Sequence, residues 1–206
     1  MPRGILLHSV TKPSWWWGPD EEYTFLNGTY TWWDLITGVW GTWSLGNDWI
    51  APASNSTRCI LRRAAPSWNF RLQHREGYYS DAWWGASSMG VCNTWPSSSI
   101  VQSTNNAFQY WSTITGGYNQ WSWIYINGAK KLTTSQLTSW NIYIDEIIYE
   151  NGVYTVSLYE DVNGEPGTKL YTATATANAA PVYLWLYHEW GTGTKAQTNR
   201  IKVRHL

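Results

Sequence analysis

The feature that most constrains this sequence is a succession of apolar runs in its last third, separated by short turns such as Asn-Gly. Each run is rich in Val, Ile, Thr, Tyr and Trp and is bounded by Gly, Asn, Asp or Pro, which is the pattern of antiparallel strands joined by tight turns. The strands predicted in this region are Asn141–Tyr149, Val153–Tyr159, Lys169–Thr176, Val182–His188 and Asn199–Leu206.

Residues of opposite character alternate along the run 181–188. Val182, Leu184 and Leu186 share one face because successive side chains of a strand point to opposite sides. These aliphatic residues suit a core between two packed sheets. The other face carries aromatic rings, and we expect it to form an outer surface, a groove or a second core. Its residues are Tyr183, Trp185 and Tyr187.

This part of the chain resembles the concanavalin A-like lectin and glucanase jelly rolls. The resemblance rests on the segments NGVYTVSLYEDVNG, KLYTATAT, PVYLWLYHEWGTGT and NRIKVRHL, taken in that order. It implies an all-β fold, an antiparallel two-sheet β-sandwich, in which Ile201 and Val203 of the last strand enter the core. Because one fold hosts many functions, the resemblance predicts architecture and not activity.

The beginning of the chain predicts an arm. Trp15, Trp16 and Trp17 stand between Lys12-Pro13 and Gly18-Pro19, and proline disfavours a central strand. We expect this assembly arm, residues 1–20, to pack across the sandwich or to reach a neighbouring subunit. Residues 21–206 then form a single jelly-roll domain, a length that one β-sandwich accommodates.

The segment between the arm and the last third predicts further strands and two irregular stretches. Residues 76–99 read as a long turn-rich loop, and residues 132–140 as one helical turn between the sheets. The predicted strands are Glu22–Leu26, Thr29–Trp33, Val39–Leu45, Thr57–Arg63, Trp68–His74, Ile100–Ser103, Ala107–Ile114 and Gln120–Ile126.

A second aromatic face is expected on the strand Gln120–Ile126, where Trp121, Trp123 and Tyr125 alternate with smaller residues. If this strand neighbours Val182–His188 in one sheet, the six rings of the two strands tile a flat surface. These six residues are our candidates for binding carbohydrate or a partner, because such rings combine an apolar face with a polar edge. A subunit contact or a second core is the alternative.

The composition limits the possible partners. Basic and acidic residues balance at 14 each, so we expect no nucleic-acid partner and no polybasic membrane contact. No run of apolar residues is long enough for a membrane-spanning helix. The 18 Trp and 14 Tyr are more than one core readily encloses, which predicts association between copies of the chain or binding to glycans. With only 14% charged residues, we expect a virion or extracellular location.

The chemistry visible in the sequence is sparse. Resemblance to glucanases implies a Glu-x-Asp-x-x-Glu strand, but the comparable residues here, Asp145 and Glu146, are adjacent and must face opposite sides. The segment 161–165 resembles part of a calcium loop but is better explained as a hairpin turn. The four histidines are scattered, and Cys59 and Cys92 either pair or stay free.

The sequence therefore predicts a non-enzymatic structural or adhesive protein that self-associates as a capsid, decoration, fibre or extracellular assembly subunit. No catalytic residue, metal or cofactor is expected. A carbohydrate-binding module is the alternative, and a glycoside hydrolase is a weaker one.

Overall fold

The structure of the chain is a computed structural model. The predicted strands Thr29–Trp33 and Ile100–Ser103, and the arm tryptophans, lie outside the residues that it describes. The residues that the structure describes are 20–24, 34–36, 43–45, 50–52, 57–79, 84–94, 107–114, 119–134, 137–138, 141–190 and 195–206.

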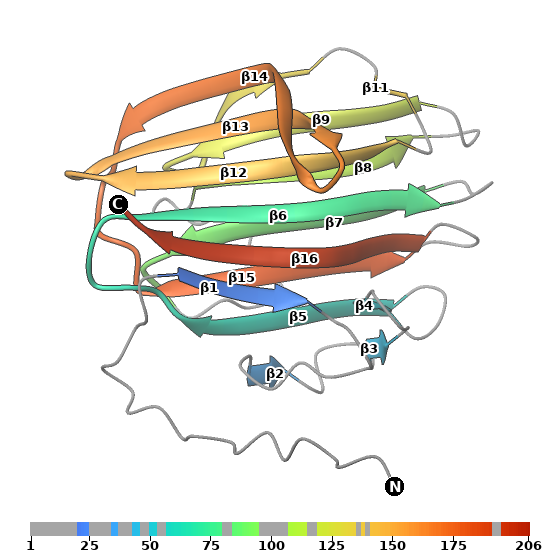
Figure 1. Cartoon of the computed structure of the whole chain (residues 1–206), viewed down its shortest axis with the longest axis horizontal. Helices are drawn as coiled ribbons and strands as arrows, with labels where there is room; N and C mark the ends of the chain where they lie inside the picture. The colour runs from blue at the N-terminus through green and yellow to red at the C-terminus, as the bar shows by residue number, and fades with distance from the viewer. Residues whose placement is uncertain are drawn as a thin grey trace, which may run out of the picture.

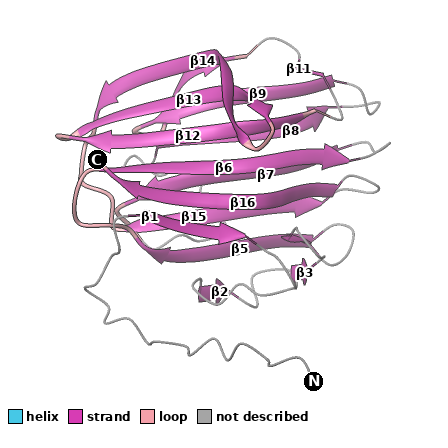
Figure 2. Cartoon of the chain, viewed as in Figure 1, coloured by secondary structure: helices cyan, strands magenta, loops and turns pink. Residues whose placement is uncertain are grey.

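Within these stretches the chain forms strands and turns and no helix, and the strands build two packed sheets (Figure 2). The predicted antiparallel two-sheet β-sandwich is therefore confirmed. The strands of the first sheet are β1 (Asp20–Thr24), β3 (Trp43–Leu45), β4 (Ile50–Pro52), β6 (Phe70–Tyr79), β12 (Ile142–Glu150), β13 (Val153–Val162), β14 (Glu165–Thr176) and β16 (Lys195–His205). Their order is β14-β13-β12-β6-β16-β4-β3, with β1 also pairing to β16.

The second sheet lies behind the first in Figure 1. Its strands are β2 (Asp34–Ile36), β5 (Thr57–Ala64), β7 (Trp84–Cys92), β8 (Ala107–Ile114), β9 (Asn119–Ile126), β10 (Ala129–Thr133), β11 (Leu137–Thr138) and β15 (Tyr183–Trp190). Their order is β10-β9-β8-β7-β15-β5-β2, with β11 also pairing to β9. Because β6 and β16 pair in the first sheet while β7 and β15 pair in the second, the chain crosses repeatedly between layers.

Three Asn-Gly pairs close the hairpins of the described region. At Asn127-Gly128, Asn151-Gly152 and Asn163-Gly164 both residues have positive φ. Asn and Gly tolerate this conformation, and its twist matches the right-handed twist of the flanking strands. These hairpins join β9 to β10, β12 to β13 and β13 to β14, at positions that the sequence marks as turns.

The main core lies between the sheets and is mostly aliphatic. Leu184 and Leu186 enter it from β15, and Ile201 and Val203 from β16, as the alternation predicts. Val182, predicted to share their face, is instead exposed because it precedes β15. The other fully buried members are Phe70, Leu72, Met89, Val91, Ala107, Ile124, Ile126, Ile147, Tyr154 and Val156.

Two predictions of irregular structure were wrong. The stretch 76–99 contains the end of β6 and all of β7, because the ladders with β15 and β8 override its glycines. The predicted helical turn at 132–140 contains the end of β10 and the short strand β11. Both pair with β9, so sheet pairing outweighs the local helical pattern.

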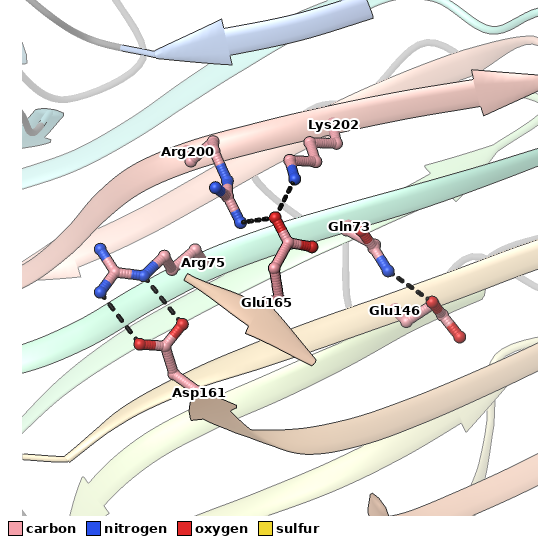
Figure 3. Close-up of polar contacts among 7 residues, drawn as sticks. All are labelled: Gln73, Arg75, Glu146, Asp161, Glu165, Arg200 and Lys202. Carbon is pink, nitrogen blue, oxygen red and sulfur yellow. Dashed lines mark hydrogen bonds and ion pairs between the residues drawn. The ribbon is translucent and has the colours of Figure 1, made fainter. Parts of the chain in front are cut away.

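The hairpin between β13 and β14 folds back over the outer face of the first sheet (Figure 1). We call residues 161–167 the strap. Asp161 accepts two hydrogen bonds from Arg75 on β6, at 2.9 and 3.0 Å. Further along, the Glu165 carboxylate lies 2.6 Å from the Lys202 ammonium and 3.6 Å from the Arg200 guanidinium, both on β16 (Figure 3). The strap thus crosses β12 and β6, fixed by charge at both ends.

Candidate functional site

The outer face of the second sheet carries a continuous row of cross-strand neighbours. Tyr125 of β9 pairs in register with Phe108 of β8, and Phe108 pairs with Gly90 of β7. Gly90 in turn pairs with Trp185 of β15, and Trp185 pairs with Arg62 of β5. Residues paired in register point to the same face of a sheet, so this row presents its side chains together.

Rings in this row stack from strand to strand. The rings of Phe108 and Tyr125 are nearly parallel, with centroids 4.8 Å apart and an interplanar angle of 8°. Phe108 also packs against Trp185, with ring centroids 5.4 Å apart and the ring planes tilted. Gly90, having no side chain, leaves the space over β7 for the Trp185 indole. Offset and tilted ring pairs at these distances are favourable beyond the area that they bury.

The rings of Phe108, Trp185 and Tyr125 belong to a second apolar cluster on this outer face. The buried members are Ile60, Cys92, Phe108, Trp185 and Tyr187, with Tyr125 and Tyr183 packed against them. The second sheet therefore carries an apolar cluster on each of its faces. This arrangement corresponds to the second core that the sequence leaves open as an alternative to a binding surface.

The six predicted binding residues divide between buried and open positions. Their strands, β9 and β15, lie in one sheet but are not neighbours, since β8 and β7 separate them. Trp185 is 1% exposed and Tyr187 8%, so neither ring is available to a ligand. Trp123, Tyr125 and Tyr183 are half-buried. The side chain of Trp121, and the arm tryptophans Trp15, Trp16 and Trp17, lie outside the described residues.

The open end of the row combines rings with a cation. The Lys130 ammonium of β10 lies 5.3 Å from the ring centroid of Trp123, within cation–π distance. Partial burial raises the pKa of the Tyr125 hydroxyl above its ordinary value. Because Trp123 and Tyr125 are two residues apart on β9, they lie side by side on one face. These three residues form what we call the β9 platform.

The free thiol of Cys92 lies in the same cluster. Its sulfur donates a hydrogen bond of 3.0 Å to the carbonyl oxygen of Thr94, and burial raises its pKa to about 12. Of the two alternatives for the cysteines, the structure therefore favours the free form for Cys92.

The inner faces of the sheets bring together polar residues that the sequence leaves scattered. His74 and His188, far apart in the chain, place their ring centroids 6.3 Å apart. Each Nε2 atom lies 2.7 Å from the hydroxyl of Thr198. The alternation of β6 and β15 places both histidines on core-facing positions, but that signal does not show that they meet.

Two carboxylates join this internal cluster. Glu76 and Asp145 are 1% and 0% exposed, and both approach Nδ1 of His74. Burial raises the pKa of Glu76 well above its ordinary value and lowers the pKa of His74. Asp145 faces inward while Glu146 faces outward, where it accepts a hydrogen bond from Gln73, so the prediction that they lie on opposite faces is confirmed.

The segment resembling a calcium loop is the strap. Asp161 is held by Arg75, and Glu165 by Lys202 and Arg200. The side-chain hydrogen bond that Lys202 donates, together with the positive charge of its ammonium, lowers the pKa of Glu165. Since cationic side chains already bind these carboxylates, the strap does not fit a calcium ion, which requires six to eight oxygen ligands.

Comparisons with known proteins agree with this architecture. No family model and no curated protein matches the sequence. Among solved structures, the lumenal domain of VIP36 in its Ca2+- and mannose-bound form has a TM-score of 0.65 at 9% identity, over 91% of this chain and 90% of that one. A legume lectin-like domain from Entamoeba histolytica has a TM-score of 0.62 at 11% identity, over 89% and 97%.

A Bacillus licheniformis β-glucanase is also similar, with a TM-score of 0.58 at 11% identity over 92% of this chain and 99% of that one. The chain has the concanavalin A-like jelly-roll fold. In this jelly roll the last strand, β16, enters the core with alternate residues, as the resemblance of the last third implies. No helix among the described residues has the length and hydropathy needed to cross a bilayer.

Proposed function

We propose that this jelly roll is a non-enzymatic, lectin-like protein that binds carbohydrate on the outer face of its second sheet. The observation that carries the proposal is the β9 platform: Trp123 and Tyr125 side by side, half-open, with Lys130 over the indole. Sugar rings present flat C–H faces that stack on such aromatic side chains, and their hydroxyls accept hydrogen bonds from an ammonium.

The rings behind the platform give it rigidity. Tyr125 stacks on Phe108, and Phe108 packs on the fully buried Trp185. A ring held on one side by a packed neighbour loses little conformational entropy when a ligand covers its other side, which favours affinity. The fold shared with lectins agrees with this proposal.

The buried carboxylates support the non-enzymatic part of the proposal. Retaining and inverting glycosidases place two carboxyl groups on either side of the scissile bond. Glu76 and Asp145 lie close together, but they lie between the sheets, where a polysaccharide does not reach. Glu146, on the outer face of the first sheet, is bound to Gln73 and Tyr159.

A glycan array followed by titration calorimetry tests the proposal. We expect the wild-type protein to retain a defined set of glycans, and Trp123→Ala and Tyr125→Ala each to weaken binding about tenfold or more. Tyr159→Ala is the matched control, because Tyr159 is also half-buried beneath a lysine, with Lys169 5.3 Å from its ring centroid, but lies on the other sheet.

The control variant should bind as the wild type does. Equal binding by all three variants would overturn the assignment to the β9 platform, and an array without any retained glycan would overturn carbohydrate binding itself. Trp185→Ala is a poor probe, since removing a fully buried indole perturbs the fold.

Self-association is a second candidate function, favoured by the edge of the first sheet. β14 spans 12 residues, and among the described strands its only ladder partner is β13. The open edge of a long strand offers unpaired N–H and C=O groups to a strand from a second copy. Such a copy would make the chain a subunit of a virion or of an extracellular assembly, which the low charge and the abundant Trp favour.

Sedimentation at micromolar concentration tests this second candidate. A dimer or larger species that dissociates when Thr174 on β14 is replaced by proline is the expected result, because proline removes a backbone donor and disrupts strand pairing. A wild-type monomer at all concentrations would contradict it.

A further inference from the structure

Six polar side chains from five strands meet inside the sandwich, in a core that is mostly apolar. Each is at most 1% exposed. They come from β6, β7, β12, β15 and β16, which lie in both sheets, so the group links the two layers. The residues are His74, Glu76, Ser87, Asp145, His188 and Thr198.

Three of these side chains converge at the spacing of metal ligands. Nδ1 of His74 lies 3.5 Å from Oδ2 of Asp145 and 3.7 Å from Oε2 of Glu76, and one ligand atom from each lies within 4.8 Å of the others. A tetrahedral ion with bonds of about 2.0–2.2 Å separates its ligand atoms by about 3.3–3.6 Å. The two distances from Nδ1 of His74 are therefore close to the separations between ligand atoms around a coordinated ion.

Two polar atoms of these side chains are unsatisfied. Within the described part of the chain, neither Nδ1 of His74 nor Oε1 of Glu76 has a hydrogen-bond partner, although both side chains are almost completely buried. Buried polar atoms in folded proteins nearly always have a partner, and an orphaned one indicates a ligand, an ion or a functional role.

The surroundings orient the imidazole for coordination. The hydroxyl of Thr198 lies 2.7 Å from Nε2 of both His74 and His188, and it has one proton, so it donates to one ring and accepts from the other. When Nε2–H of His74 donates to Thr198, its Nδ1 presents a lone pair to the carboxylates. Metal-bound histidines are commonly held by such a hydrogen bond from the second nitrogen. Ser87 donates to Glu76 and orients that carboxylate in the same way.

We propose that His74, Glu76 and Asp145 form an internal structural site for a divalent transition metal, with Zn2+ the best-matched ion. One imidazole and two carboxylates suit zinc, whereas calcium takes six to eight oxygen ligands. The two carboxylates balance the charge of the ion. The bound metal joins β6 to β12. It reaches the second sheet through Ser87 on β7 and, by way of Thr198 on β16, through His188 on β15.

Metal analysis and thermal unfolding test the proposal. Protein refolded with Zn2+ and then dialysed should carry one zinc per chain, as measured by elemental mass spectrometry. Compared with protein in chelator, its melting temperature should rise by roughly 5–10 °C when free Zn2+ is about 100 times Kd. Ca2+ should give no such shift. Co2+ bound in place of zinc should show visible ligand-field absorption.

Isosteric variants separate a metal site from a merely hydrogen-bonded cluster. Glu76→Gln and Asp145→Asn keep the shape of each side chain and should lose the zinc and its thermal shift. Asp161→Asn removes a carboxylate from the strap, outside the cluster, and should keep both. If one ligand variant fails to fold, the other variant and the cobalt spectrum of the wild type still distinguish a metal site from a hydrogen-bonded cluster.

Absence of stoichiometric zinc, together with an unchanged melting temperature, would overturn the proposal. Zinc binding by Glu76→Gln and Asp145→Asn at the wild-type level would also overturn it, because the ion would then lie elsewhere. Both outcomes are independent of glycan binding, which depends on the outer face of the sheet.

Discussion

Gly90 of β7 lies beneath the indole ring of Trp185 on β15. A Cβ atom at position 90 would lie 2.6 Å from Cε2 of Trp185 and 2.6 Å from Cβ of Phe108. No such contact is tolerated between packed atoms, so the aromatic row across the second sheet requires glycine at this place. Gly90 leaves the space that the Trp185 indole fills, so the aromatic row continues from β8 to β15.

Gly90→Ala should therefore destabilise the protein by about 1–3 kcal/mol, the usual cost of an overpacked core position. Urea denaturation of the purified variant measures the effect. A double-mutant cycle with Trp185→Phe gives the control, because the smaller ring should recover part of the loss. If the two changes were additive, the cost of Gly90→Ala would not come from the indole.

The ion pair between Arg75 and Asp161, which holds the strap on the first sheet, should contribute to the stability of the protein. Both side chains are largely buried, and the guanidinium donates two hydrogen bonds to the carboxylate. Asp161→Ala should cost about 1.5–3 kcal/mol of unfolding free energy, the range for hydrogen bonds to charged groups. Glu160→Ala, at the exposed neighbouring position, should stay within about 0.5 kcal/mol. Equal stability of the two variants in urea would contradict this prediction.

Glu76 should make the stability of the metal-free protein depend on pH. Burial raises its pKa well above the ordinary value of 4.5, so the folded protein keeps a proton that the unfolded chain releases. The stability contributed by such a group is complete below about pH 4.5 and is lost as the pH rises toward the folded pKa.

Glu76→Gln cannot ionise and should gain stability relative to the wild type as the pH rises from about 5 to about 8, by up to about 1.4 kcal/mol per pH unit. Urea denaturation in chelator across this range measures the difference. His74 is present in both proteins, and its lowered pKa makes both less stable as the pH falls below 6.5. A stability difference that does not change with pH would show that Glu76 ionises normally.

Cys92 should resist alkylation in the folded protein. The thiolate is the reactive form, and a pKa of about 12 leaves only about one part in ten thousand ionised at about pH 8. We expect iodoacetamide followed by peptide mapping to find Cys92 unmodified under native conditions and modified in urea. Rapid labelling of the native protein would contradict the buried position of this thiol.

Local sequence patterns predict a large part of this fold. Asn-Gly pairs mark three hairpins, and their positive φ angles are those that these residues readily adopt. Alternation places Leu184 and Trp185 on opposite faces of β15, as the structure confirms. It also assigns Asp145 and Glu146 to opposite sides. These features depend on backbone geometry within a few residues, so the sequence carries them without knowledge of distant partners.

The sequence alone determined the hairpins, the all-β class and the face to which each side chain points, because a strand has a period of two. Only the tertiary structure decided which strands lie side by side. It separated β9 from β15 by two strands, which buried Trp185 and left Tyr125 half-open. It also brought His74 to His188 across the layers, since such contacts depend on the registers of long-range pairing, which no local pattern encodes.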